Sequence, residues 1–115
     1  SDTKGAELER NAFWDIGYRN PFFEDGVLES VRFFNDKLND TDEAYAILLN
    51  AVNLNPFSIR LNQAYALQCL KTGLVSYAEE TMEELKTWMP TVTYKTFEQE
   101  VLKTLQQIEF NSSDW

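Results

Sequence analysis

Clustered acidic side chains are the residues of this chain whose spacing could do chemistry. Glu79 and Glu83 lie four residues apart, so on a helix they share one face, where paired carboxylates could hold a metal ion or transfer a proton. A second acidic group lies upstream, at Asp36, Asp40, Asp42 and Glu43. This second group has no glycine where a calcium-binding loop needs its sharp turn. We therefore expect both groups to be solvated helix faces and helix starts, and we expect no metal site.

Nucleophilic and acid-base catalysis lack their usual residues. The chain contains no histidine, the commonest general base and metal ligand, which rules out Ser-His, Cys-His and His-metal chemistry. Its one cysteine, Cys69, has Lys71 two positions along and therefore on another helix face, so we expect a buried, unreactive thiol. No phosphate loop, dinucleotide-binding turn or nucleophile elbow is present. The sequence predicts a protein that is not an enzyme and needs no cofactor.

Composition limits the partners of the chain. Its 115 residues suit one domain, residues 1–115. The net charge of −9 repels nucleic acids and anionic lipid surfaces, so we expect neither as a partner. No apolar run approaches the roughly 20 residues of a membrane span. The sequence begins with Ser1, which leaves open a processed protein or an excerpt of a longer one. The compartment stays undetermined, with a slight preference for the cytoplasm.

Helix start and stop signals recur along the chain. Asp40 stands three residues before Glu43, and Ser76 three before Glu79, the spacing at which a capping oxygen and a returning carboxylate satisfy each other's amides. Gly73 can adopt the left-handed conformation that ends a helix. We therefore expect helices to begin near Asp40 and Ser76 and one to end near Gly73.

The expected fold is all-α. Pro56 and Pro90 cannot continue a helix, and alternating strand-like runs are missing. The connections are short, which forces neighbouring helices to be antiparallel. A charge-free stretch from Ala44 to Pro56 suggests an enclosed helix. The signals predict helices over residues 6–18, 26–38, 41–53, 58–72, 77–88 and 93–110.

The chain also repeats itself with a period of 34 residues. Shifting the sequence by that distance places the turn residue Asn39 on Gly73. The same shift places apolar, small and proline residues together, pairing Ala44 with Ala78, Leu48 with Met82, Ala51 with Leu85, Leu54 with Trp88 and Pro56 with Pro90.

This pattern resembles the tetratricopeptide repeat, a unit of two helices with small residues at close helix crossings and a closing proline. The second unit carries small Ala66, Gly73, Ala78 and Pro90, whereas the first has bulky Arg32 where Ala66 aligns. The resemblance implies antiparallel hairpins stacked as a short right-handed superhelix. Its predicted parts are a weak repeat at 25–58, the best repeat at 59–92 and a capping helix at 93–110.

The resemblance further implies a non-catalytic module that binds proteins or peptides on the concave face lined by the first helix of each unit. The alignment assigns seven residues to that face: Glu29, Phe33, Asp36, Arg60, Gln63, Leu67 and Lys71. The net charge favours a basic partner. Two alternatives stay open: a structural or regulatory segment of a larger protein or enzyme, and a self-association domain.

Aromatic residues crowd the first part of the chain. Two interpretations apply to them, packing against the second helix or a docking place for an upstream element or a partner. The cluster comprises Phe13, Trp14, Tyr18, Phe22 and Phe23.

Overall fold

Helices make up all the regular secondary structure between residues 3 and 113, the part of the chain that the computed structural model describes. The all-α prediction is confirmed over this range, and residues 1–2 and 114–115 of the predicted domain lie outside it. The elements follow in the order α1 (Thr3–Tyr18), α2 (Glu24–Arg32), the π-helical turn η1 (Phe33–Lys37), α3 (Thr41–Leu54), α4 (Ile59–Lys71), α5 (Val75–Trp88) and α6 (Thr91–Ser113).

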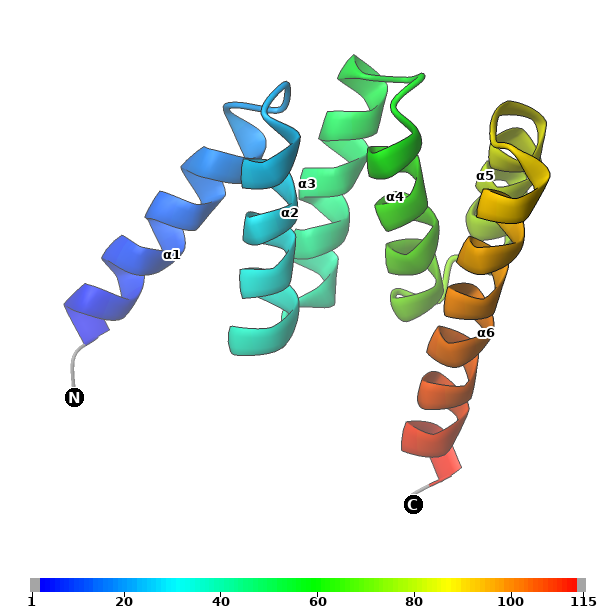
Figure 1. Ribbon diagram of the computed structural model, residues 1–115. Coiled ribbons are helices and arrows are strands. Elements are labelled where there is room, and N and C mark those ends of the chain that lie inside the picture. The colour runs from blue at the N-terminus through cyan, green and yellow to red at the C-terminus, as the bar shows by residue number, and fades with distance from the viewer. Residues whose placement is uncertain (1–2, 114–115) are drawn as a thin grey trace.

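Successive helices run in opposite directions, as the short connections require (Figure 1). The helices α2, α4 and α6 run one way, and α1, α3 and α5 run the other way. The first helix, α1, leans away from α2 toward its N-terminus. None of the helices between residues 3 and 113 is long and apolar enough to cross a membrane.

The helix start predicted at Asp40 is confirmed. Its Oδ1 accepts a hydrogen bond from the Glu43 backbone N–H at 3.0 Å. The returning half of the capping box does not form, because the Asp40 backbone N–H donates to the Phe34 carbonyl at 2.7 Å instead. The Glu43 carboxylate instead lies 3.8 Å from the Arg10 guanidinium of α1.

A helix does begin next to Ser76, but the capping role predicted for Ser76 is wrong. Helix α5 begins at Val75, with Leu74 as its N-cap and no side-chain capping bond. Gly73 adopts a positive φ of 83°, as predicted, and the Leu74 N–H donates to the Cys69 carbonyl at 2.7 Å. This tight turn closes α4 and leads directly into α5, whose first backbone hydrogen bond runs from the Ala78 N–H to the Leu74 carbonyl at 3.2 Å.

The helices and turns repeat with the period seen in the sequence. Helices α3 and α5 begin 34 residues apart and also end 34 residues apart. Asn39 has a φ of 51°, so the two aligned turn residues both adopt the left-handed conformation. Loops one period apart are also joined, because Asn55 Nδ2 donates to the Pro21 carbonyl at 3.0 Å and Ser58 Oγ donates to Glu24 Oε2 at 2.6 Å.

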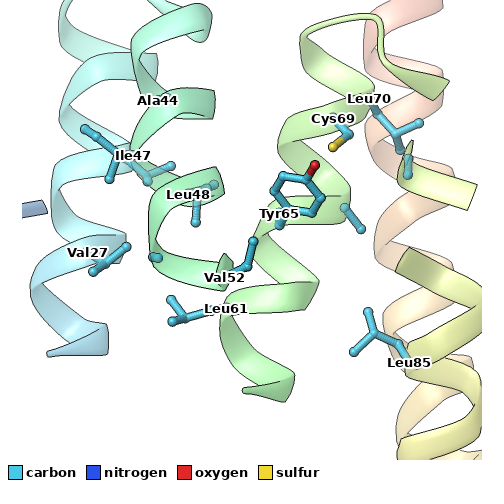
Figure 2. Packing of buried hydrophobic residues seen from close by; sticks show 14 of the residues in the cluster. Val27, Ala44, Ile47, Leu48, Val52, Leu61, Tyr65, Cys69, Leu70 and Leu85 are labelled. Carbon is cyan, nitrogen blue, oxygen red and sulfur yellow. The ribbon is translucent and has the colours of Figure 1, made fainter. Parts of the chain in front are cut away.

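Helix α3 lies at the centre of the hydrophobic core (Figure 2). Its residues Ala44, Ile47, Leu48 and Ala51 are all fully buried. This burial explains why the first part of the charge-free stretch carries no charge, since burying one would cost its hydration. Its last turn differs, because Leu54 is half exposed.

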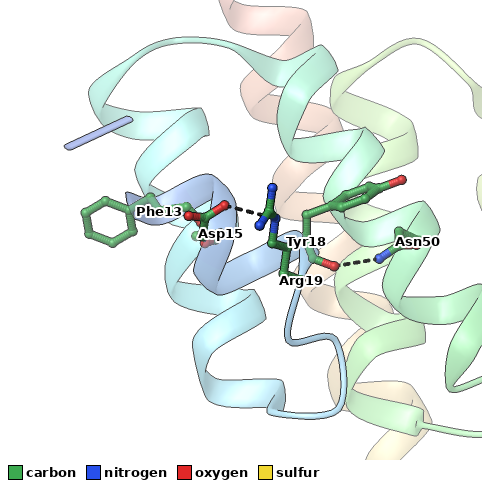
Figure 3. A network of polar contacts seen from close by, with 6 residues as sticks. Phe13, Asp15, Tyr18, Arg19 and Asn50 are labelled. Atoms are coloured by element: carbon green, nitrogen blue, oxygen red, sulfur yellow. Dashed lines mark hydrogen bonds and ion pairs between the residues drawn. The ribbon is translucent and has the colours of Figure 1, made fainter. Parts of the chain in front are cut away.

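A close crossing fixes α1 against the next hairpin. A Cβ atom on Gly17 would lie 2.6 Å from the Ser30 Cβ and 3.0 Å from Ile47 Cγ2, so only glycine fits. The buried Ser30 hydroxyl donates to the Phe13 carbonyl. At the end of α1, Asn50 Nδ2 donates to the Tyr18 carbonyl at 3.1 Å (Figure 3).

Candidate functional site

The seven predicted binding residues differ in their exposure, and three of them, Glu29, Phe33 and Asp36, line one shallow hollow of about 290 Å³ together. Two are partly covered: the amide of Gln63 lies 3.8 Å from the Met89 sulfur, and Leu67 packs against the core. Phe33 is buried. Four are exposed, namely Glu29, Asp36, Arg60 and Lys71.

The expectation that Phe33 faces solvent is wrong. Only 7% of it is exposed, because the Phe13 ring of α1 stacks on it with the centroids 4.1 Å apart and the planes 11° from parallel. Phe34 meets its edge, and the Lys37 ammonium lies 5.7 Å from its centroid. Phe33 therefore belongs to the α1–α2 interface, where a charged substitution would disrupt packing.

The π turn after α2 also departs from the predicted regular helix. The Leu38 N–H donates to the Phe33 carbonyl, five residues back, at 3.2 Å. Within this turn, Asn35 exchanges two amide hydrogen bonds with Gln68 of α4, of 2.8 and 3.0 Å. Gln68 Nε2 also donates to the Thr41 carbonyl at 2.9 Å. The pair ties η1 to α4 and to the start of α3.

One groove lies between η1, which continues α2, the end of α4 and the second half of α6, and we call it the α2–α6 groove. Its volume is about 480 Å³. Asp36 and Lys71, two of the predicted residues, lie on it together. The complete lining is Asn35, Asp36, Thr41, Lys71, Glu100, Lys103, Thr104, Gln107, Ile108 and Asn111.

Sequence reasoning missed the contribution of α6 to this groove. The predicted capping helix at residues 93–110 was given no residues on a binding surface, whereas α6 follows α5 in the row of helices and packs beside α4. The order of the helices could have indicated this contact between α6 and α4. Lys103 and Glu100 of α6 add one charge of each sign beside Asp36 and Lys71.

The other two exposed predicted residues, Glu29 and Arg60, lie on a second groove, which we call the α1–α2 groove. Its volume is about 630 Å³, and its lining is Ile16, Asn20, Phe23, Asp25, Gly26, Leu28, Glu29, Arg32 and Arg60. Arg60 reaches it from α4 and pairs with Asp25 at 2.6 Å. The aromatic cluster divides here: Phe13 and Trp14 pack against the core, whereas Phe22 and Phe23 are exposed.

The candidate chemical groups lie elsewhere. Within residues 3–113, no three acidic or cysteine side chains are placed to hold a metal ion. Glu79 and Glu83 are exposed on α5.

Cys69 is buried, and burial raises the pKa of its thiol despite a hydrogen bond from Tyr65 that lowers it. Burial, and next the hydrogen bond with Tyr45, also raises the pKa of Tyr65. Both groups therefore keep their protons at neutral pH.

No protein-family model matches the chain, and no curated protein or solved structure matches it either. The function proposed for this chain therefore comes from its grooves.

Proposed function

We propose that the chain is a non-catalytic module of the tetratricopeptide repeat type that binds a protein segment in the α2–α6 groove. One observation supports the proposal: η1, the end of α4 and the second half of α6 line one groove of about 480 Å³. Stacked helical repeats commonly bind partners on the surface that their repeated helices share. The groove has a volume of about 480 Å³ and charged residues that can orient the side chains of a bound segment.

The lining indicates the chemistry of the ligand. Asp36 and Glu100 can accept hydrogen bonds from a basic side chain, while Lys71 and Lys103 can bind a carboxylate. Ile108, half-buried at the same groove, offers a small apolar contact. A peptide with charges of both signs around an apolar residue fits this lining. The net charge of −9 speeds the approach of a partner that is basic overall, an effect that weakens with salt.

Exchanging two charges across the groove tests the proposal. In the variant Asp36→Lys with Lys71→Glu, net charge and composition barely change but the local pattern is reversed. Peptides selected on the parent chain from a random display library should bind this variant about tenfold more weakly, or ~1.4 kcal/mol. Calorimetry or fluorescence anisotropy measures the difference in dissociation constant.

A matched exchange on α5 provides the control. Glu83 and Lys86 are both exposed on α5, and neither lines the groove, so Glu83→Lys with Lys86→Glu should leave binding unchanged. If both exchanges reduce affinity equally, or if neither does, the α2–α6 groove is not the binding site.

A further inference from the structure

An apolar row on α1 leaves much of its surface exposed, although Ile16 at one end also packs over Gly26 of α2. Helix α1 packs against α2 and α3 through the side that carries Gly17. Leu8, Ala12 and Ile16 recur every four residues on another side and are exposed, Leu8 by 64% and Ile16 by 41%. The row continues into the α1–α2 groove, because Ile16 and Phe23 both line it.

The position of α1 in the repeat shows what kind of element fits beside this row. Helix α1 precedes α2 and packs on it, as α3 precedes α4 and packs on it. It therefore has the place of a second helix in a hairpin. In the hairpins α2–α3 and α4–α5, an antiparallel first helix covers the second one. The uncovered row on α1 fits an antiparallel helix of the same type.

Helix α6 has the complementary position and the complementary surface. It runs in the direction of α2 and α4, the first helices, and buries Tyr94, Phe97 and Val101. A different side carries Leu102 and Leu105, which are 46% and 36% exposed. These leucines do not line the α2–α6 groove, so a contact through them leaves that groove open.

We propose that the chain associates head to tail with a second copy, with α6 of one copy antiparallel to α1 of the next. The contact buries Leu102 and Leu105 against the row of Leu8, Ala12 and Ile16. Where the two copies meet, α6 and α1 then form an antiparallel hairpin of the same type as α2–α3 and α4–α5. Because the two surfaces differ, the interface is heterologous and can extend beyond a dimer.

Charge favours the same pairing. Glu98 and Glu109 flank Leu102 and Leu105 at helical spacing on α6. Lys4 lies near one end of α1, and Arg19, which already pairs with Asp15 at 3.3 Å, directly follows the other end. Antiparallel docking brings Glu98 toward Arg19 and Glu109 toward Lys4, so each end joins opposite charges. The net charge of −9 opposes association of two copies, and salt screens this repulsion. Association should therefore strengthen with moderate salt, whereas basic-partner binding in the α2–α6 groove should weaken.

Sedimentation velocity of the 115-residue chain at increasing concentration tests the proposal. The parent should show a concentration-dependent rise in mass, and Ile16→Asp or Leu102→Asp should each abolish it. Tyr77→Asp is the matched control. Tyr77 is a half-exposed residue of α5 that lines a pocket together with residues of α3, so it belongs to neither of the two proposed contact surfaces. This control should associate like the parent, and circular dichroism melting should show that all variants are folded.

Mixing the variants separates this interface from other arrangements. Ile16→Asp retains an intact α6 surface and Leu102→Asp an intact α1 surface, so an equimolar mixture should form dimers and nothing larger. In a second, milder set, Arg19→Glu should weaken association and the double variant Arg19→Glu with Glu98→Arg should restore it. A parent that stays monomeric at its highest soluble concentration overturns the proposal. So does association that survives either aspartate substitution, or a mixture that stays monomeric.

Discussion

Replacing Ala66 or Ala78 with tryptophan should lower the free energy of unfolding by about 3 kcal/mol, the upper part of the range for overpacked cores. The two alanines are 0% and 1% exposed in α4 and α5, the pair of helices that forms the second hairpin. An indole at either position can fit only if the helices separate. For a domain of this size each lost kcal/mol should lower the melting temperature by roughly 4 °C.

Glu83→Trp is the matched control for these substitutions. It introduces the same side chain into α5 at an exposed position, where the change in stability should stay within about 0.5 kcal/mol. Thermal and urea unfolding of the three variants measure the effect. Equal losses in all three would contradict the assignment of Ala66 and Ala78 to close helix crossings.

Substitution of Gln68 with leucine should cost about 2–4 kcal/mol, although leucine is apolar and similar in size. Gln68 is 1% exposed, and its amide serves both Asn35 and the Thr41 carbonyl. Leucine would leave these partners without their hydrogen bonds in a largely buried place. The cost comes from their lost hydration and should appear in chemical denaturation.

The double variant Asn35→Leu with Gln68→Leu tests that explanation. When both amides are removed, only the Thr41 carbonyl loses its hydrogen-bond donor, Gln68. The loss of stability in the double variant should therefore be smaller than the sum of the losses in the two single variants. Simple additivity would show that the reciprocal amide pair contributes little.

The sequence was sufficient to predict the helices and their period. Asp40, Gly73 and the two prolines act through local backbone chemistry, which requires no knowledge of distant contacts. Asn39 and Gly73 were aligned by the 34-residue shift and both adopt positive φ. The buried state of Cys69 was also predictable from its apolar neighbours.

The errors concern contacts between helices far apart in the sequence. Phe33 was assigned to an exposed face because it aligns with Leu67, but Phe13 of α1 covers it. The Asn35–Gln68 pair joins residues 33 positions apart and has no counterpart in periodicity or composition. The role of α6 in the groove likewise depends on how it lies beside α4.

Nuclear magnetic resonance of the ¹⁵N-labelled chain, titrated with the strongest peptide from the display selection, tests the proposed binding groove most directly. The largest amide shifts should occur at Asp36, Lys71, Lys103 and Gln107, on the parts of η1, α4 and α6 that line the α2–α6 groove. The charge exchange at Asp36 and Lys71 should diminish these shifts. Shifts concentrated instead on the side where α3 and α5 meet, around Tyr77 and Glu80, would show that the peptide binds elsewhere.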